Sequence, residues 1–340
     1  MTIHEKILKT ISDCGPLPFS KFMEIALYDA EHGFYSTGGA GRKKDFITSP
    51  ETGPLFGKLV AKAIDQWWIE LGKPQDFTFL ESGSGPGTLA RSILRSDLVC
   101  REALNYIAVE ISQSQREEHP SNIASSDEMP ERIENGIIFA NELLDNLPFD
   151  IFESCEDGTW KEVRIGSEDG SLTEILLPSS GNEPGFSVSE NKVRVPVQKA
   201  VQEWLATAFS TLQNGRIVII DYAIDHFPPE GNRNWLRTYK GHELTENPLT
   251  EPGKKDITSD IDISQLETVR KASSIKTQRQ WLMELGIEKL VKEGKEYWLE
   301  NAHNPNVNAL EARSRIVESE ALLDPNSLGG FKVIEWKVKS

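Results

Sequence analysis

The chain has 340 residues, enough for one large domain with insertions or for two smaller domains. Hydrophobic residues make up 38% and charged residues 26%, which is typical of a globular protein and excludes a disordered or fibrous one. The 53 acidic residues outnumber the 37 basic ones, giving a net charge of −16. Because such a chain repels a phosphate backbone, we predict no nucleic-acid partner and expect cationic partners instead.

The three cysteines, Cys14, Cys100 and Cys155, lie far apart and form no CxxC pair, so they predict neither a disulfide framework nor a metal site. The histidines show no metal-ligand spacing either, and we assign no metal. No apolar run reaches the ~20 residues that span a bilayer. The first residues resemble neither a signal peptide nor a transit peptide. We therefore predict a cytoplasmic protein without a membrane segment.

The N-terminal region, residues 1–72, is predicted to form a helical cap. Thr2 and Glu5 have the spacing of a capping box at the start of a first helix. Ser20 can cap a second helix. The segment 49–51, with sequence Ser-Pro-Glu, is predicted to open a long third helix, because a cap, a proline and an acid favour the first turn.

From residue 73 onward, short apolar runs alternate with helical stretches. The expected strands are residues 77–80, 106–109, 137–140, 217–220 and 331–336. Strands that alternate with helices favour a parallel sheet covered on both faces. We predict a Rossmann-like α/β domain over residues 73–340. It has an inserted β-hairpin region at about 151–195 and a long loop region without periodic elements at about 223–274.

A glycine-rich turn is the most informative segment of the chain. The first expected strand is followed by Glu81, and then Gly83, Gly85 and Gly87 stand at alternate positions before a helical stretch. Glycine permits a sharp turn and allows a ligand to lie against bare backbone N–H groups. The segment therefore predicts a ligand site at the end of this strand.

Three interpretations of this turn compete. A P-loop requires the pattern GxxxxGK[ST], which is absent. A dinucleotide fingerprint requires glycine or alanine three residues after Gly85, where Thr88 stands. The observed ExGxGxG spacing favours S-adenosylmethionine, since Glu81 suits a ligand with a positive amino-acid end and suits a pyrophosphate poorly. A dinucleotide site and a purely structural turn remain alternatives.

Acidic and amide side chains follow the next two expected strands. Glu110 follows the run 106–109, where a carboxylate can accept hydrogen bonds from both hydroxyls of an adenosine ribose. Asn141 and Glu142 follow the run 137–140, at the sheet edge where ligands of open α/β sheets bind, and would face the methyl-donor sulfur. The alternatives are helix caps and first-turn acids. Glu110 alone does not distinguish S-adenosylmethionine from NAD, because both carry a ribose diol.

Taken together, these motifs resemble the MidA-like family of S-adenosylmethionine-dependent methyltransferases. The similar segments, in chain order, are residues 27–35, 45–51, 81–89, 109–112, 141–148, 221–222, 236–242, 256–262 and 330–333. That family includes a mitochondrial complex I assembly factor that methylates protein arginine. The resemblance implies a class I methyltransferase fold, S-adenosylmethionine as cofactor, and a protein substrate with an accessible arginine.

The resemblance also implies site residues, because in the family the segment 46–51 folds over the cofactor. The cofactor-binding residues predicted from the motifs and the resemblance are Phe46, Thr48, Pro50, Glu81, Gly83, Gly85, Gly87, Glu110, Ile111, Asn141 and Glu142. The chain departs from the family pattern at three positions. Lys44 and Ala223 stand where glycine is usual, and Ser84 stands where proline is common.

Methyl transfer to arginine would require carboxylates to bind and orient the guanidinium, since its pKa above ~12 prevents ready deprotonation. The catalytic candidates are Glu142, Asp145 and Asp221. The candidates for binding a basic substrate segment are Asp45, Tyr222, Asp260 and Asp262, the last two in an acidic loop that could alternatively be a solvated surface. A non-catalytic, S-adenosylmethionine-binding assembly factor is the alternative function.

Overall fold

The computed structural model describes residues 1–37, 48–179, 181–186, 188, 190, 192–227, 235–240, 243–245 and 247–339. The chain divides into two compact units. Unit 1 comprises Met1–Phe46, Leu144–Ala206 and Ala223–Arg270, and unit 2 comprises Ile47–Leu143, Thr207–Tyr222 and Lys271–Ser340. This division differs from the predicted boundary at residue 72, because the long third helix belongs to unit 2, whereas the first predicted insertion and residues 223–270 of the second belong to unit 1.

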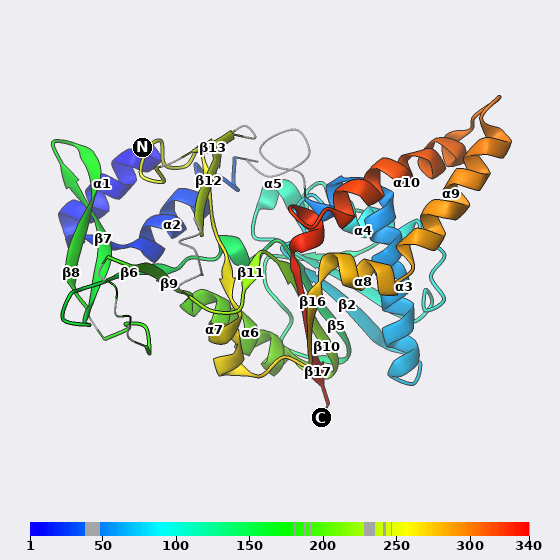
Figure 1. The fold of residues 1–340 in the computed structure, drawn as a ribbon, viewed down its shortest axis with the longest axis horizontal. Coiled ribbons are helices and arrows are strands. Elements are labelled where there is room, and N and C mark those ends of the chain that lie inside the picture. Colours follow the sequence, from blue (N-terminus) through cyan, green and yellow to red (C-terminus); the bar gives the residue numbers. More distant parts are fainter. Residues whose placement is uncertain are drawn as a thin grey trace. The chain divides into compact units, whose positions relative to one another are not determined.

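A seven-stranded sheet forms the centre of unit 2, with strand order β16-β17-β10-β5-β2-β3-β4 (Figure 1). The strands are β2 (Phe77–Ser82), β3 (Leu104–Val109), β4 (Ala124–Ser126), β5 (Ile133–Asn141), β10 (Leu212–Asp221), β16 (Ser274–Thr277) and β17 (Lys332–Val338). Neighbours from β4 to β10 are parallel, and β17 runs antiparallel to both β10 and β16. The predicted Rossmann-like α/β fold is confirmed, and each expected strand coincides with or overlaps an observed one.

Helices cover both faces of this sheet. The helices with residues in unit 2 are α3 (Pro54–Glu70), α4 (Thr88–Leu94), α5 (Gln113–Arg116), α8 (Gln278–Glu284), α9 (Ile287–Asn301), α10 (Val307–Leu323) and the C-terminal part of α6 (Lys199–Thr211). One hydrophobic core contains residues of α3, α4 and α8 together with Phe79 and Phe139 of the sheet. On β17, Trp336 packs against Phe209 of α6, with ring centroids 6.3 Å apart. Alternate side chains of the strands thus serve the two faces.

Unit 1 combines helices with three small sheets. Its remaining helices are α1 (Ile3–Cys14), α2 (Phe19–Tyr28) and α7 (Ile263–Val269). One sheet has the order β1-β7-β6-β9 with β8 beside β7, formed by β1 (Leu17–Pro18), β6 (Asp150–Ser154), β7 (Trp160–Glu168), β8 (Ser171–Pro178) and β9 (Arg194–Val197). The other strands are β11 (Ala223–Ile224), β12 (Leu236–Lys240), β13 (Glu243–Thr245), β14 (Asp256–Ser259) and β15 (Ile261–Asp262).

The region 223–274 therefore differs from its prediction as a loop without periodic elements. It contains β11 to β15, α7 and part of β16. Each strand has two to five residues. Segments this short give little hydrophobic periodicity, and their pairing with one another provides the order.

Of the residues predicted to cap α1 and α2, only those of α1 act as predicted. The capping box of Thr2 and Glu5 at the start of α1 is confirmed. The prediction that Ser20 caps the second helix is wrong, since α2 begins at Phe19. The backbone N–H of Ser20 instead donates to the carboxylate of Asp150 at 3.1 Å. Asp150, which is distant in sequence, thus accepts a backbone N–H of the first turn of α2, where we had expected a local side chain to act as the cap.

The start of the long third helix also differs from the prediction. The segment Ser49–Glu51 forms a separate 3₁₀ turn, η1, and α3 begins only at Pro54. No side chain next to α3 caps it; the carboxylate of Glu318 on α10 accepts the N–H of Leu55 at 2.8 Å. Both groups are buried, so this hydrogen bond holds the start of α3 against α10.

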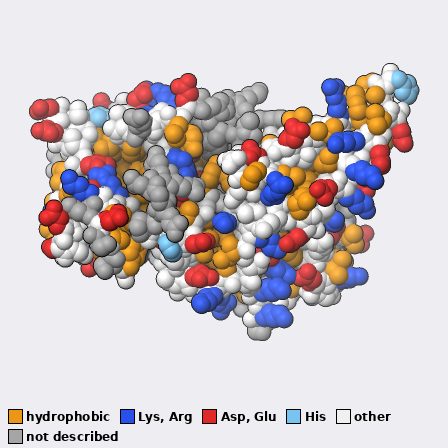
Figure 2. Space-filling view, viewed as in Figure 1, with side chains coloured by type: hydrophobic (Ala, Val, Ile, Leu, Met, Phe, Trp, Pro, Cys, Tyr) orange, Lys and Arg blue, Asp and Glu red, His pale blue; other side chains and the backbone are white. Residues whose placement is uncertain are grey.

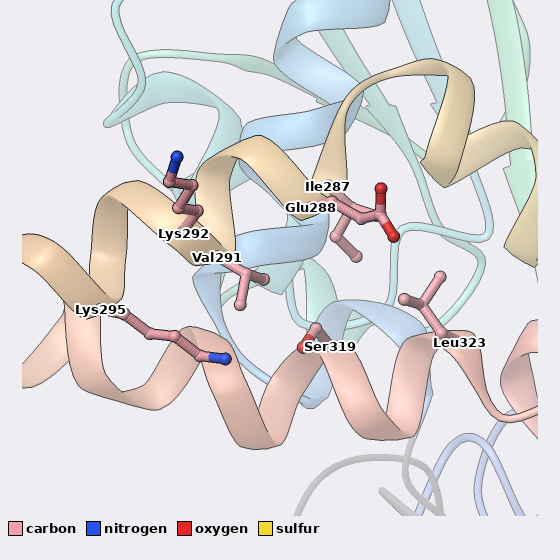
Figure 3. A pocket seen from close by; sticks show the side chains of 7 residues that line it. All are labelled: Ile287, Glu288, Val291, Lys292, Lys295, Ser319 and Leu323. Carbon is pink, nitrogen blue, oxygen red and sulfur yellow. The ribbon is translucent and has the colours of Figure 1, made fainter.

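Among the described residues, no helix combines the length and the apolar character needed to cross a bilayer. The same part of the chain contains no cluster of three or more His, Cys, Asp or Glu suited to a metal ion. A groove of about 280 Å³ lies between α9 and α10, with Lys292 and Lys295 on α9 and Ser319 on α10 among its lining residues (Figure 3).

We predict that Glu318→Ala lowers the free energy of unfolding by about 1–3 kcal/mol, because it leaves the buried N–H of Leu55 without a hydrogen-bond acceptor. Urea unfolding followed by circular dichroism measures the change. Glu300→Ala, an exposed acid near the end of α9, is the matched control and should change the value by less than about 0.5 kcal/mol. Equal effects of the two variants would contradict the capping role.

Candidate functional site

The candidate site lies at the carboxyl ends of the parallel strands of unit 2. β2 and β5 are neighbours in the sheet. The chain continues from β2 to β3 on one side of this pair and from β5 to β10 on the other side. This is a topological switch point, where open α/β sheets bind ligands. The glycine turn follows β2, Glu110 follows β3, Asn141 ends β5 and Asp221 ends β10. The sheet thus brings four predicted site segments to one edge.

The glycine turn adopts a conformation that requires glycine. The φ angles of Gly83, Gly85 and Gly87 are +70°, +53° and +78°, in the left-handed region that side chains disfavour. The N–H groups of Gly83 and Ser84 both donate to the carbonyl of Val109, at 2.9 and 3.1 Å. These N–H groups anchor the turn to β3 and are not the bare ligand contacts that we expected from the sequence.

Of the three glycines in the turn, Gly85 has the least covered Cα atom. A Cβ atom built on Gly85 would meet only the Oε1 atom of Gln115, at 3.3 Å. A Cβ on Gly83 would lie 2.8 Å from the side chain of Leu143. The surface beside Gly85 therefore has room for a ligand, whereas Gly83 is already closely covered.

Glu110 is a buried carboxylate with capacity for two further hydrogen bonds. Its Oε2 accepts the N–H of Gly85 and its Oε1 accepts the N–H of Ser112, both at 2.9 Å. Burial raises the pKa of Glu110, and the two backbone hydrogen bonds oppose this shift. Each carboxylate oxygen has two lone pairs, so each can accept one more donor. The arrangement fits a diol. Ile111, the next residue, is 55% exposed and offers an apolar surface beside it.

Glu81 has a different environment at the same sheet edge. It is buried and accepts a short hydrogen bond from the hydroxyl of Tyr106. Burial raises the pKa of Glu81 to about 8, and the hydrogen bond from Tyr106 opposes the shift only in part. The side chain of Glu81 is therefore mostly neutral at pH 7. It would attract the ammonium group of a ligand, as predicted, only if the positive charge of the bound ligand lowered the pKa of Glu81.

Asn141 and Glu142 form a hydrogen-bonded pair after β5. The side-chain amide of Asn141 donates to Oε1 of Glu142 at 2.9 Å, and the same oxygen accepts the N–H of Ser49 at 2.9 Å. Among the described residues, Oδ1 of Asn141 is buried and has no hydrogen-bond partner. Asn141 ends a strand, and the next helical turn, η2, begins only at Leu144, so Asn141 is not the helix cap of the alternative interpretation.

The backbone of Glu142 is strained. Its φ angle is +51°, in the left-handed region that costs a non-glycine residue about 1–2 kcal/mol. Its N–H donates to the carbonyl of Ile220 on β10 at 2.8 Å, which holds the residue in this conformation. Strain of this kind concentrates at functional sites, and Glu142 directly follows β5 at the carboxyl edge of the sheet.

The remaining predicted residues of unit 2 lie close to this edge of the sheet or along the chain before α3. Asp221 is fully buried and accepts the N–H of Tyr222 at 2.8 Å. The half-buried ring of Tyr222 packs on Phe331, with centroids 4.0 Å apart. Thr48 and Pro50 are half-buried in and before η1. Two further predicted residues, Asp45 and Phe46, lie outside the described residues.

Three predicted acids belong to unit 1. Asp145 accepts the hydroxyl of Thr258 at 2.9 Å, and burial raises its pKa to about 6. Asp260 forms a buried ion pair with Arg237 at 2.8 Å. Asp262 caps α7 and accepts backbone N–H groups of its first turn. All three are buried, which excludes the alternative of a solvated acidic surface, and Asp262 has the geometry of a structural cap.

Two residues near the glycine turn were not predicted. Gln115 is buried, and its Oε1, which points toward Gly85, has no hydrogen-bond partner within the described part of the chain. The ring of His119 contacts the carbonyl of Gly85 through Nε2 and the hydroxyl of Ser125 through Nδ1, both at 2.8 Å. The only sequence signal was their position shortly after Glu110, because α5, which carries Gln115, has just four residues.

This geometry agrees with the comparison with known families. A family model described as "Putative S-adenosyl-L-methionine-dependent methyltransferase" matches residues 59–280, well over half of the chain. The chain belongs to this family. The predicted family resemblance, enzyme class and cofactor, S-adenosylmethionine, are thereby confirmed.

Similar members of this methyltransferase family are named protein arginine methyltransferase NDUFAF7, mitochondrial. The Mus musculus protein is 27% identical over 84% of this chain and 74% of its own length, and the Homo sapiens protein is 25% identical over 95% and 80%. The Drosophila melanogaster homologue is 28% identical over 76% and 67%. Because these relatives are mitochondrial, the predicted cytoplasmic location is contradicted; sequence features that suggest no targeting peptide do not identify a compartment.

Two crystal structures of a Burkholderia thailandensis protein have the same fold as this methyltransferase. One contains S-adenosyl-homocysteine; it is 22% identical, with a TM-score of 0.81 over 98% of this chain and 91% of that one. The other is a native structure, 23% identical, with the same TM-score and coverage. They confirm the class I methyltransferase fold.

We predict that Glu81→Gln stabilises the protein increasingly as the pH rises from about 4.5 to about 8. A carboxyl whose pKa is higher in the folded than in the unfolded protein loses stability in that window, because the unfolded chain ionises first. Glutamine cannot ionise, so the difference in unfolding free energy should grow by up to ~1.4 kcal/mol per pH unit. Urea unfolding at several pH values measures it, with Glu300→Gln as the exposed control. A difference that stays constant with pH would show that Glu81 titrates normally.

Proposed function

We propose that this protein transfers a methyl group from S-adenosylmethionine to an arginine side chain of a protein substrate. The observation that carries the proposal is Glu142, whose backbone is strained and whose carboxylate accepts a hydrogen bond from Asn141 at the carboxyl edge of the sheet. The names of the relatives, which are protein arginine methyltransferases, support the choice of acceptor. A net charge of −16 also favours a basic substrate.

The residues around the glycine turn fit the cofactor. The part of S-adenosylmethionine that lies against the glycine turn would occupy the open surface beside Gly85. The two remaining acceptor positions of Glu110 would bind the ribose hydroxyls. The acceptor oxygens of Asn141 and Gln115, which have no hydrogen-bond partner among the described residues, would meet its amino groups. Ile111 would cover the adenine. When bound, S-adenosylmethionine supplies an electrophilic methyl group on a positively charged sulfur.

In this proposal Glu142 binds and orients the substrate guanidinium. The N–H of Ser49 and the amide of Asn141 both donate to its Oε1, so the orientation of the carboxylate is fixed before substrate arrives. Because Oε1 already accepts two donors, the proposed contact is a charge-assisted hydrogen bond from the guanidinium to Oε2. Orientation of this kind accounts for catalysis largely through positioning, with the reacting atoms held ~3–3.5 Å apart.

Asp221, at the end of β10, is the second acid proposed for this role, and Tyr222 is proposed to line the substrate side. The N–H of Tyr222 already orients the Asp221 carboxylate. Asp145 is a weaker candidate, because it is buried in unit 1 and its carboxylate accepts the hydroxyl of Thr258. Asp262 is weaker still as a substrate contact, since its carboxylate is occupied by the cap of α7.

We predict that Gly85→Ala weakens S-adenosylmethionine binding at least 10-fold, measured by calorimetry, because the new methyl group fills the open surface beside the turn. The left-handed backbone strain should cost about 1–2 kcal/mol of stability. Gly72→Ala is the matched control: its φ is +82° and its Cβ would meet nothing within 4 Å. The control should lose similar stability and keep its affinity. Equal affinity of both variants would reject the site.

We predict that Glu142→Gln binds S-adenosylmethionine within about 3-fold of wild type but transfers methyl groups at least ~100-fold more slowly. Glutamine keeps the size of the side chain and loses the charge that pairs with a guanidinium. Transfer is measured by mass spectrometry on arginine-containing peptides with matched lysine versions as controls. Wild-type protein that binds the cofactor yet methylates no arginine in an extract of its own cells would favour the non-catalytic assembly factor.

A further inference from the structure

The helices α9 and α10 pack against each other and extend as an arm away from the sheet of unit 2 (Figure 1). The inner face of α10 is buried through small and apolar residues such as Ala309, Ala312 and Leu322. Apolar side chains also occur on the outside of the arm, among acidic and basic ones (Figure 2). The arm follows residue 280, where the match to the family model ends.

The outer face of α10 carries a regular seam. Its residues are Val307, Leu310, Ser314, Val317 and Ala321, spaced alternately three and four apart. The three large ones are 71%, 50% and 69% exposed. Single exposed apolar residues are ordinary, but this spacing is the a/d repeat with which one helix packs along another. The seam therefore predicts a second helix on this face.

Charge favours a second copy of this chain as the partner. Residues 287–323 contain seven acidic and five basic residues, so charges of both signs can pair across a twofold axis. An antiparallel pairing of α10 with α10 of the second copy places the rest of each acidic copy at opposite ends of a helix ~25 Å long, which limits the repulsion between them.

The charges that flank the seam match an antiparallel register. When Ser314 lies opposite Val317 of the second copy, Arg313 lies opposite Glu320 of the second copy, and the twofold axis repeats this pair. Arg313 and Glu320 are both exposed, and the guanidinium of Arg313 lies 5.0 Å from the ring of Trp298, beside the seam.

The acids on the other flank do not oppose this pairing. Glu311 forms an ion pair with Lys58 at 3.4 Å. Glu318 is buried and accepts the N–H of Leu55. We propose that α10 pairs antiparallel with α10 of a second copy through this seam and forms a reversible homodimer.

The contact is one helix long, below the roughly 1,200–2,000 Å² of a standard stable interface, so we expect a dissociation constant in the micromolar range. Sedimentation velocity from about 1 µM to about 1 mM measures it on the full chain. Val317→Glu should leave a monomer throughout this range, with an unchanged circular dichroism spectrum. A wild-type protein that stays monomeric up to about 1 mM overturns the proposal, whether or not the seam binds a helix of another protein.

Charge reversal tests the register. Arg313→Glu and Glu320→Arg should each weaken dimerisation about 10-fold or more, because each places like charges opposite one another, and the double variant should restore it. Glu300→Arg, on α9 outside the seam, is the control and should leave the dimer unchanged. Single reversals without effect overturn the seam as the interface, and a double variant that fails to recover overturns the antiparallel register.

Discussion

The attachment of the glycine turn to the end of β3 is the constraint on which the site depends. The carbonyl of Val109 accepts two N–H groups of the turn, and Glu110 accepts a third, from Gly85. These bonds hold the glycines in left-handed conformations and leave Gly85 the least covered of the three. The bond from Gly85 fixes one oxygen of Glu110, and the N–H of Ser112 fixes the other. The same turn therefore shapes the surface proposed for the cofactor and helps to orient the carboxylate proposed to bind its ribose.

Two glutamates at this sheet edge show how environment separates residues that look alike in sequence. Glu81 and Glu110 each directly follow an expected strand. Glu81 is hydrogen-bonded to Tyr106 in the interior, and burial raises its pKa to about 8. Glu110 receives two backbone N–H groups that favour its charged form and oppose the effect of burial. We infer that Glu110 interacts directly with the ligand, whereas Glu81 chiefly joins β2 to β3 through its hydrogen bond with Tyr106.

Local patterns in the sequence were sufficient for the parallel sheet, the glycine turn and the acids that follow the strands, because these features depend on spacing within a few residues. Features that depend on distant pairs were not predictable in this way. The acid that accepts the first N–H of α3, that of Leu55, is Glu318, more than 250 residues further along the chain. Likewise, the position of Gln115 near Gly85 follows from the packing of β3 beside β2. The buried ion pair of Asp260 was not predictable either, because its partner, Arg237, stands more than 20 residues earlier on the short strand β12.

Glu142 depends on both local sequence and contacts with distant segments. Its position after a buried strand identified it from the sequence, but its left-handed backbone did not follow from any local signal. The conformation is maintained by a backbone bond to β10 and by a side-chain bond from the N–H of Ser49, which precedes α3. Three separate segments of unit 2 therefore converge on one strained residue. Without these contacts the backbone of Glu142 would relax to an ordinary conformation, so the surrounding structure maintains the strain and fixes Oε1 of the carboxylate at the same time.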